Sequence, residues 1–203
     1  IVVVNVQRGG PSTGLPTKTE QSDLMQALYG RNGESPSVVL ASSTPGNCFD
    51  WAYMASKITL EHNTPVVLLS DGYLGNGAEP WKIKSTKDMP EINPSIAVEG
   101  EEYQPYARDE KTLARKIALP GTKGLEHRLG GLEKEDITGN VSYDPDNHEK
   151  MVGIRSEKIK RIAYVIPDQQ VFGKEEGDLL VIGWGGTHGS LYSAVDNLLA
   201  EGE

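Results

Sequence analysis

Short, continuous apolar runs alternate along this chain with segments whose apolar residues have helical spacing. This alternation limits the possible folds more than any other feature. Residues 1–4, 37–41 and 64–71 are rich in β-branched and other apolar side chains. Such runs are typical of strands buried on both faces of a parallel sheet. Strand, helix and strand in this order predict right-handed parallel crossovers, and therefore an α/β layer fold built on a parallel sheet.

Two helices are predicted between these strands. Residues 19–28 place Leu24, Ala27 and Leu28 at helical spacing. A second helix is expected after residue 44, because Thr44 can cap its first turn and Pro45 suits its first position. The inward stripe expected for this second helix consists of Cys48, Ala52, Ala55 and Thr59.

The pattern weakens between residues 73 and 140, where prolines interrupt it repeatedly. So long an irregular segment is usually functional, disordered or laid across another domain. Its aromatic residues favour packing, so we expect an arm that wraps its own assembly. A helix should follow from Asp144 and Pro145, ahead of a polar linker at residues 169–178. The residues expected to share one face of that helix are Met151, Ile154, Lys158 and Ile162.

The last part of the chain repeats the strand and helix order. Residues 179–184 predict a fourth buried strand, and a glycine-rich turn follows at residues 185–189. A final helix should come next. Its inward-facing residues are expected to be Leu191, Ala194, Val195, Leu198 and Leu199.

The first strand must end near Arg8, which lies in a glycine-rich turn. In parallel sheets functional groups gather beyond the carboxyl ends of strands. Gly9 and Gly10 would let a ligand approach the backbone and its N–H groups, and a guanidinium can grip a carboxylate or phosphate through two parallel hydrogen bonds. The sequence therefore predicts a small-anion site here, with a solvated surface turn as the alternative.

The amino-acid sequence around Arg8 resembles that of a known family. Residues 4–17 (VNVQRGGPSTGLPT) resemble a signature stretch in the α subunit of thiamine-dependent 2-oxoacid:acceptor oxidoreductases, most closely the 2-oxoglutarate:ferredoxin enzymes. Three further stretches resemble that subunit in the same order: LSDGY at 69–73, PGTKGLEH at 120–127 and DPDNHEKM at 144–151. The similarity runs along nearly the whole chain.

The resemblance implies an oxidative decarboxylation. A 2-oxoglutarate enzyme converts its substrate and coenzyme A to succinyl-CoA and CO2, and passes electrons to ferredoxin. It implies thiamine diphosphate with Mg²⁺, shared with a β subunit, and an iron-sulfur cluster in that partner chain. Pyruvate or another 2-oxoacid remains an alternative substrate, and a non-catalytic α/β interaction scaffold is the alternative outside enzymes.

The same resemblance places Arg8 as the substrate-binding arginine, with Gly9 and Gly10 in its motif. The distal carboxylate of 2-oxoglutarate needs a second anchor, for which Lys18 is a candidate, although a solvated lysine fits the sequence equally. The family's proline-rich motif and its thiamine-activating glutamate have no counterpart here, so no catalytic group and no cofactor-binding residue is assigned within the chain.

The family comparison also predicts a piece of a longer subunit, since the chain opens on Ile1 in mid-strand. Activity is not expected from this piece alone. Residues 1–75 are expected to form the later half of a pyrimidine-type thiamine-diphosphate-binding domain, and residues 76–177 an irregular arm, helix and linker. Residues 178–203 would open a transketolase C-terminal-like domain.

The amino-acid composition excludes several classes of binding partner. Cys48 is the only cysteine, so thiolate ligands for an iron-sulfur cluster or zinc must come from another chain. A net charge of −9 argues against nucleic acid or an anionic membrane as the main partner. No run of residues approaches the length of an apolar membrane helix. We expect a cytoplasmic hetero-oligomer with the β subunit, ferredoxin and the 2-oxoacid as partners.

Several other residues are weaker candidates for a functional site. The turn at 183–189 fits an anion such as a phosphate of coenzyme A, or a structural turn. Asp71 ends a strand, where a helix cap is favoured over a ligand contact. Cys48 is expected to be an inert thiol on an apolar stripe. The four histidines have no metal-ligand spacing, and His127 beside Glu126 is the best of them for proton transfer.

Overall fold

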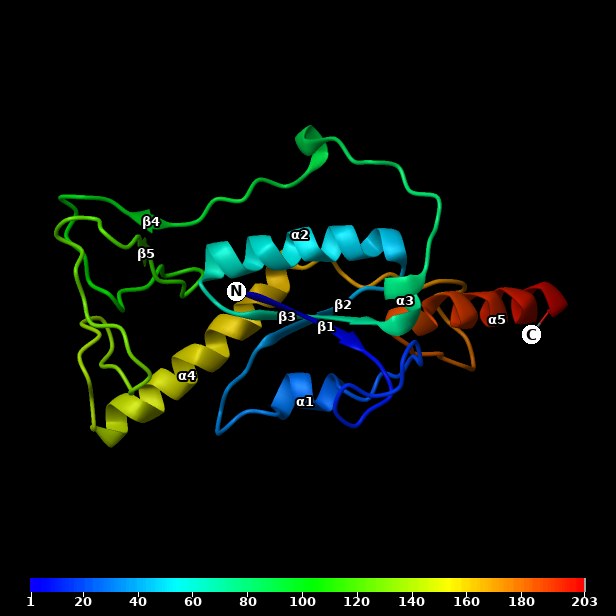
Figure 1. The fold of residues 1–203 in the computed structure, drawn as a ribbon, viewed down its shortest axis with the longest axis horizontal. Coiled ribbons are helices and arrows are strands. Elements are labelled where there is room, and N and C mark those ends of the chain that lie inside the picture. The colour runs from blue at the N-terminus through cyan, green and yellow to red at the C-terminus, as the bar shows by residue number, and fades with distance from the viewer. Residues whose placement is uncertain (203) are drawn as a thin grey trace.

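A computed structural model describes residues 1–202 and shows a small parallel sheet with helices on both faces (Figure 1). Among these residues, no helix combines the length and the apolar character needed to cross a bilayer. The elements in chain order are β1 (Val2–Gln7), α1 (Leu24–Tyr29), β2 (Val38–Ala41), α2 (Pro45–His62), β3 (Val66–Asp71), α3 (Gly72–Asn76), η1 (Thr86–Asp88), β4 (Ile96–Ala97), β5 (Ile117–Ala118), α4 (Pro145–Ile162), η2 (Ala163–Val165), η3 (Gly185–Thr187) and α5 (His188–Glu201).

The main sheet has the order β1-β3-β2, and both of its pairings are parallel. The chain crosses one face through α1 and returns over the other through α2 (Figure 1). The register pairs Val2 with Val66 and Gln7 with Asp71, so β1 and β3 end side by side. The predicted parallel α/β class is confirmed, and the carboxyl ends of two strands meet at one edge of the sheet.

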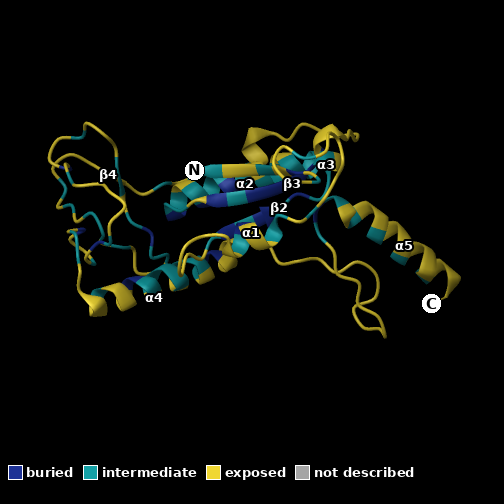
Figure 2. Ribbon diagram, turned by 60° about the horizontal axis from the view of Figure 1, so that its bottom comes forward, coloured by how far each residue is buried: buried dark blue, intermediate teal, exposed yellow. Residues whose placement is uncertain are grey.

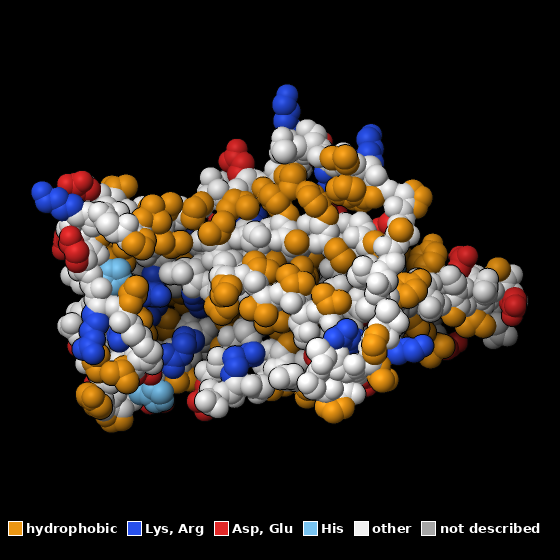
Figure 3. All heavy atoms as spheres, in the orientation of Figure 1, with side chains coloured by type: hydrophobic (Ala, Val, Ile, Leu, Met, Phe, Trp, Pro, Cys, Tyr) orange, Lys and Arg blue, Asp and Glu red, His pale blue; other side chains and the backbone are white. Residues whose placement is uncertain are grey.

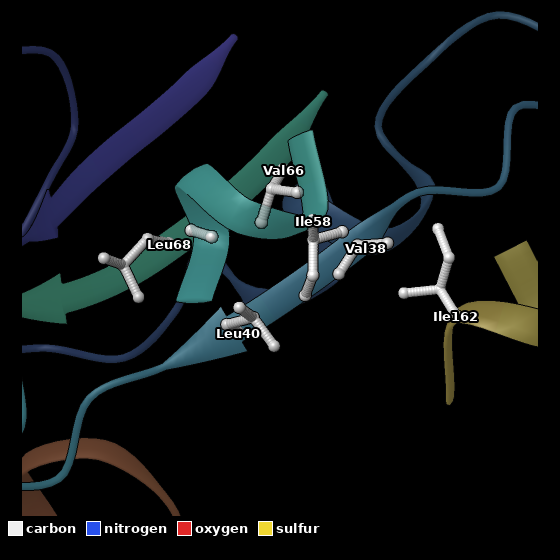
Figure 4. Close-up of a cluster of buried hydrophobic side chains, with 7 residues drawn as sticks. Val38, Leu40, Ile58, Val66, Leu68 and Ile162 are labelled. Carbon is white, nitrogen blue, oxygen red and sulfur yellow. The ribbon is translucent and has the colours of Figure 1, made fainter. Parts of the chain in front are cut away.

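The core lies between α2 and the sheet (Figure 4). Its buried members are Val38, Leu40, Ala55, Ile58, Val66, Leu68 and Ile162. Each Val, Leu or Ile side chain of this set contributes about 1.5–3 kcal/mol when fully buried. The inward face of α2 differs from the predicted stripe, because Ala55, Ile58 and His62 are buried while Ala52 is exposed. Ala55 is common to the predicted stripe and the buried face, whereas Ile58 is buried because it faces the other core residues, and His62 is buried one turn further along the helix.

The expectation that the first strand is buried on both faces is wrong for residues 1–202. β1 pairs with β3 along one edge only. Val3, Val4 and Val6 are 45%, 57% and 52% exposed, so a Val-rich surface remains open along this strand.

The first helix is also shorter than predicted and begins at Leu24. Asp23 occupies the N-cap position but its side chain makes no cap hydrogen bond; its carboxylate instead accepts from Asn5 Nδ2 at 3.0 Å.

The caps of the two long helices match the predictions. The Thr44 side chain accepts from the Asn47 N–H at 3.1 Å, and Pro45 opens α2. Asp144 accepts from the Asp146 N–H at 3.1 Å at the start of α4. On the predicted face of α4, Met151 and Ile162 are buried.

Lys158 lies on that same face of α4. Its Nζ donates to the Asn63 carbonyl at 3.1 Å. Burial and, to a smaller extent, the charges of nearby Arg115 and Arg108 together lower the pKa of this amine to about 8. The predicted role of its aliphatic stem on the inner face is consistent with this placement.

The irregular segment after α3 lies over the outer side of α2 before it reaches β4 and β5 (Figure 1). Trp81 packs on Phe49 with ring centroids 5.1 Å apart. Tyr53 donates to the Pro90 carbonyl at 2.8 Å, and the Asn93 N–H donates to Glu61 at 2.8 Å. These contacts show an ordered segment held by one helix of its own chain.

The predicted fourth strand is absent from the described residues. Residues 179–184 have irregular backbone, and Leu179, Leu180 and Ile182 are 76%, 73% and 84% exposed. A strand requires a neighbouring strand for its backbone groups, and residues 1–202 place none beside this run. The final helix does form as α5, but it projects from the body and none of its residues is buried (Figure 2). The expectation of an inward-facing apolar stripe on α5 is therefore wrong in this structure.

Candidate functional site at the carboxyl edge of the sheet

The end of β1 is held by the side chain of Gln7, which is 2% exposed. Its Nε2 donates to the Ser70 carbonyl at 3.1 Å, while its Oε1 accepts from the Asp23 N–H at 3.2 Å. A buried amide is satisfied through both of its ends. Because Gln7 is anchored in this way, the backbone of the next residue, Arg8, is held in place. The Arg8 side chain itself is exposed.

The loop after Arg8 folds back on itself. The Gly9 N–H donates to the Lys18 carbonyl at 2.9 Å, and the Gly9 carbonyl accepts from the Leu15 N–H at 2.7 Å. The expectation that the Gly9 N–H serves a ligand is therefore wrong, because the loop closure uses it. Gly10 is exposed with open space around its Cα, so close approach of a ligand remains possible there.

A hollow of about 410 Å³ lies beside Arg8. It is lined by Val6, Gln7, Arg8, Pro16, Thr17, Gly72 and Asn76. These residues come from the end of β1, the returning loop and α3. The structure thus brings Arg8 to a concave surface, whereas Gly9, Gly10 and the exposed Lys18 lie outside its lining. Gly72 and Asn76 were not predicted from the sequence, in which the strand end at Asp71 is the available signal for them.

Asp71 caps α3, as the sequence analysis favoured. Its Oδ1 accepts from the N–H groups of Tyr73 and Leu74, both at 2.9 Å. Its Oδ2 accepts from the Gly186 N–H at 3.0 Å. The anion reading of the 183–189 turn fails for Gly186, because the carboxylate of Asp71 already takes its N–H.

The remaining candidates have structural partners. His127 Nδ1 lies 2.8 Å from the Leu125 carbonyl, whereas Glu126 is exposed. His148 Nδ1 lies 2.6 Å from Glu133. His188 packs edge-on against Phe172. His62 is 3% exposed, and burial lowers the pKa of its imidazole.

Cys48 is half-buried rather than buried, with Sγ 4.0 Å from Ser70 Oγ, and its low reactivity stays a prediction. Within residues 1–202 no group of three or more His, Cys, Asp or Glu could hold a metal ion. The N–H groups of Gly9 and Gly186 are used internally. These residues therefore do not fit the Mg²⁺ and diphosphate end of thiamine diphosphate. In the hollow, Arg8 is the one cationic side chain among the lining residues.

The chain that forms this parallel α/β layer and its arginine loop matches a known protein family over most of its length. The chain belongs to the pyruvate flavodoxin/ferredoxin oxidoreductase, thiamine-diphosphate-binding family, whose model matches residues 1–143. The family resemblance of residues 4–17 is thereby confirmed.

Individual relatives share this family. The chain is 53% identical over 195 residues to the 2-oxoglutarate oxidoreductase subunit KorA of Mycobacterium tuberculosis, covering 96% of the chain and 30% of that subunit. It is 31% identical over 202 residues to the 2-oxoglutarate synthase subunit KorA of Methanothermobacter marburgensis, covering 100% of the chain and 53% of that subunit. The chain therefore spans about a third to a half of these relatives.

A solved structure is similar in fold as well. The 2-oxoglutarate:ferredoxin oxidoreductase from Magnetococcus marinus, with 2-oxoglutarate, coenzyme A and succinyl-CoA bound, superposes with a TM-score of 0.87 at 36% identity. The match covers 99% of this chain and 35% of that one. Fold and sequence thus agree on the same family.

Proposed function

We propose that this chain is part of the α subunit of an oxidoreductase that oxidatively decarboxylates 2-oxoglutarate. The reaction joins the remaining acyl group to coenzyme A, releases CO2 and passes two electrons to ferredoxin. The observation that carries the proposal is the combined fold and sequence similarity to the 2-oxoglutarate enzyme of Magnetococcus marinus. Two relatives whose names specify 2-oxoglutarate support the same substrate.

Arg8 holds a substrate carboxylate in this proposal. Arg8 lines a hollow whose volume of about 410 Å³ suits a small oxoacid. A bidentate grip fixes the orientation of the carboxylate, which positions the keto carbon for attack. The closed loop supports this role, since a side chain on a fixed backbone loses less freedom when it binds. Lys18 remains the proposed second anchor for the distal carboxylate, reached by movement of its flexible stem.

Thiamine diphosphate supplies the electron sink for decarboxylation when it is bound. We assign its diphosphate and Mg²⁺ to the β subunit, in accord with the lack of a fitting donor set in residues 1–202. We assign the iron-sulfur cluster to that partner as well, because Cys48, the one thiol of this chain, cannot supply the ligands of a cluster. Arg8 then faces an interface between the two subunits.

We further propose the domain division at residues 1–75, 76–177 and 178–203. The parallel sheet supports the first unit. The projecting α5 supports a third unit whose packing partners lie outside this chain. The assembly would be a cytoplasmic hetero-oligomer that uses ferredoxin as its acceptor.

The test is an anaerobic assay of the intact complex, with methyl viologen as the electron acceptor and thiamine diphosphate and coenzyme A present. Turnover that prefers 2-oxoglutarate to pyruvate is expected. Turnover with pyruvate or another 2-oxoacid alone would retain the reaction type and overturn the substrate. No turnover in a cofactor-replete complex with intact clusters would favour the interaction scaffold.

A further inference from the structure

Asp71 joins three parts of the chain at the edge of the sheet that carries Arg8. It is the last residue of β3 and is 1% exposed. All three of its hydrogen-bond partners are backbone N–H groups, two in α3 and one at Gly186. Each oxygen of one carboxylate thus serves a different segment, since Oδ1 holds α3 and Oδ2 holds η3.

This carboxylate is directly connected to the walls of the hollow. Asp71 pairs in register with Gln7, the residue that precedes Arg8. The helix that it caps contributes Gly72 and Asn76 to the lining. A five-residue helix has little intrinsic stability, so the position of this wall depends on its cap.

The turn at η3 is shaped to receive Asp71. A Cβ on Gly186 would lie 2.4 Å from Asp71 Oδ2, which leaves room only for glycine. Gly185 has φ +63°, and a Cβ there would lie 2.3 Å from Gln21 Nε2. That same Nε2 donates to the Trp184 carbonyl at 2.9 Å, so a second polar contact holds the turn in place.

We propose that Asp71 is a positioning residue for binding of the 2-oxoacid. By fixing α3 and the 184–187 turn together, it keeps the hollow beside Arg8 in the shape that accepts the substrate. This inference rests on the proposed function, because it names a residue that acts through the same site. Asp71 itself is buried and acts through its neighbours.

Asp71→Asn in the complete complex removes the acceptor for the Gly186 N–H and keeps the acceptor for α3. The Asn side-chain oxygen still accepts from α3 as a helix cap, whereas its amide group cannot accept from the Gly186 N–H. The KM for 2-oxoglutarate should rise about tenfold, with kcat within about threefold of wild type. The matched control is Asp196→Asn, an exposed carboxylate on α5, which should keep the wild-type KM.

A double-mutant cycle with Arg8→Ala distinguishes positioning from general loss of stability. If Asp71 acts through the Arg8 site, adding Asp71→Asn to Arg8→Ala should raise KM by less than about twofold. Full multiplication of the two effects would overturn the inference. A KM for Asp71→Asn equal to that of Asp196→Asn would also overturn it.

Gly186→Ala provides a second route if the Asp71→Asn complex does not assemble. Its Cβ must separate the turn from Asp71, so the same rise in KM is expected. Gly189→Ala is the control, since a Cβ there meets nothing within 4 Å. Equal KM values for these two variants would contradict the proposal.

The wild-type complex in the same assay tests the proposed function separately. Turnover of 2-oxoglutarate with unaltered KM in the variants refutes only the role of Asp71. If the wild type uses another 2-oxoacid, the KM comparison is made with that compound, and only the substrate assignment fails. A wild type that turns over no 2-oxoacid overturns both.

Discussion

Gly14 lies so close to Gly9 that a Cβ on Gly14 would stand 1.9 Å from the Gly9 carbonyl oxygen. Its φ of +67° is in the left-handed region that favours glycine. The Gly9 carbonyl accepts from Leu15 and the Gly9 N–H donates to Lys18, so this contact lies at the centre of the loop that follows Arg8. The loop can close in this way only if residue 14 has no side chain.

Gly14→Ala should therefore open the loop. We expect the kcat/KM of the complex for its 2-oxoacid to fall at least tenfold, because Arg8 loses its fixed backbone support. Steady-state kinetics with methyl viologen measure the effect. Gly131→Ala is the control, as a Cβ there meets nothing within 4 Å and no positive φ is required. Equal rates for the two variants would show that loop closure is irrelevant to the reaction.

Arg8→Ala should remove the grip on the substrate carboxylate. Loss of a charged hydrogen bond of this kind costs about 2–4 kcal/mol, or roughly 30-fold to 1000-fold in kcat/KM. Arg8→Lys should also be impaired, since one ammonium cannot reproduce the two-pronged contact. Lys82→Ala, at another exposed cation, is the control. Unchanged KM and kcat in Arg8→Ala would refute the site assignment even within the correct family.

Ile58→Ala should destabilise the subunit by about 2–5 kcal/mol through the cavity left in the core. Ile58 is 1% exposed and packs between α2 and the sheet (Figure 4). Leu60→Ala on the same helix should cost less than about 1 kcal/mol, because Leu60 is 42% exposed. Denaturant unfolding of the intact subunit compares the two, and similar losses would contradict the assigned face of α2.

His62 should make stability depend on pH in the weakly acidic range. Burial lowers its pKa, while Glu61 raises it and Lys158 and Lys57 lower it. Because the unfolded chain binds this proton more readily, stability is full above about pH 6.5 and falls as the pH drops below that value. The Tm should decrease more between pH 8 and pH 5.5 in wild type than in His62→Leu. An identical decrease in both would exclude His62 as the cause.

The sequence predicted the elements whose determinants are local. Thr44 with Pro45 and Asp144 with Pro145 define helix starts within a few residues, and both starts are confirmed. Arg8 was found because the end of a β-branched run marks the functional edge of a parallel sheet. Its position in a hollow agrees with that reasoning, although its role in binding stays a prediction.

The failures arise where distant segments decide the outcome. Residues 179–184 have the composition of a buried strand, yet such a run becomes a strand only beside another strand. Gln21 contacts Trp184, and Asp71 contacts Gly186, across most of the chain length. No periodicity encodes such contacts, so the sequence predicts Asp71 as a helix cap but gives no sign of its second partner, Gly186.

The spatial order β1-β3-β2 also has a consequence for synthesis on the ribosome. The middle strand of the sheet is the last of the three to be translated, and within residues 1–202 β1 and β2 each pair with β3 alone. Within this part of the subunit, β1 and β2 therefore lack their shared neighbour until residue 71 has left the exit tunnel. Nascent chains in this state expose strand edges that favour aggregation. We expect the interval before β3 emerges to be when this polypeptide depends most on chaperones.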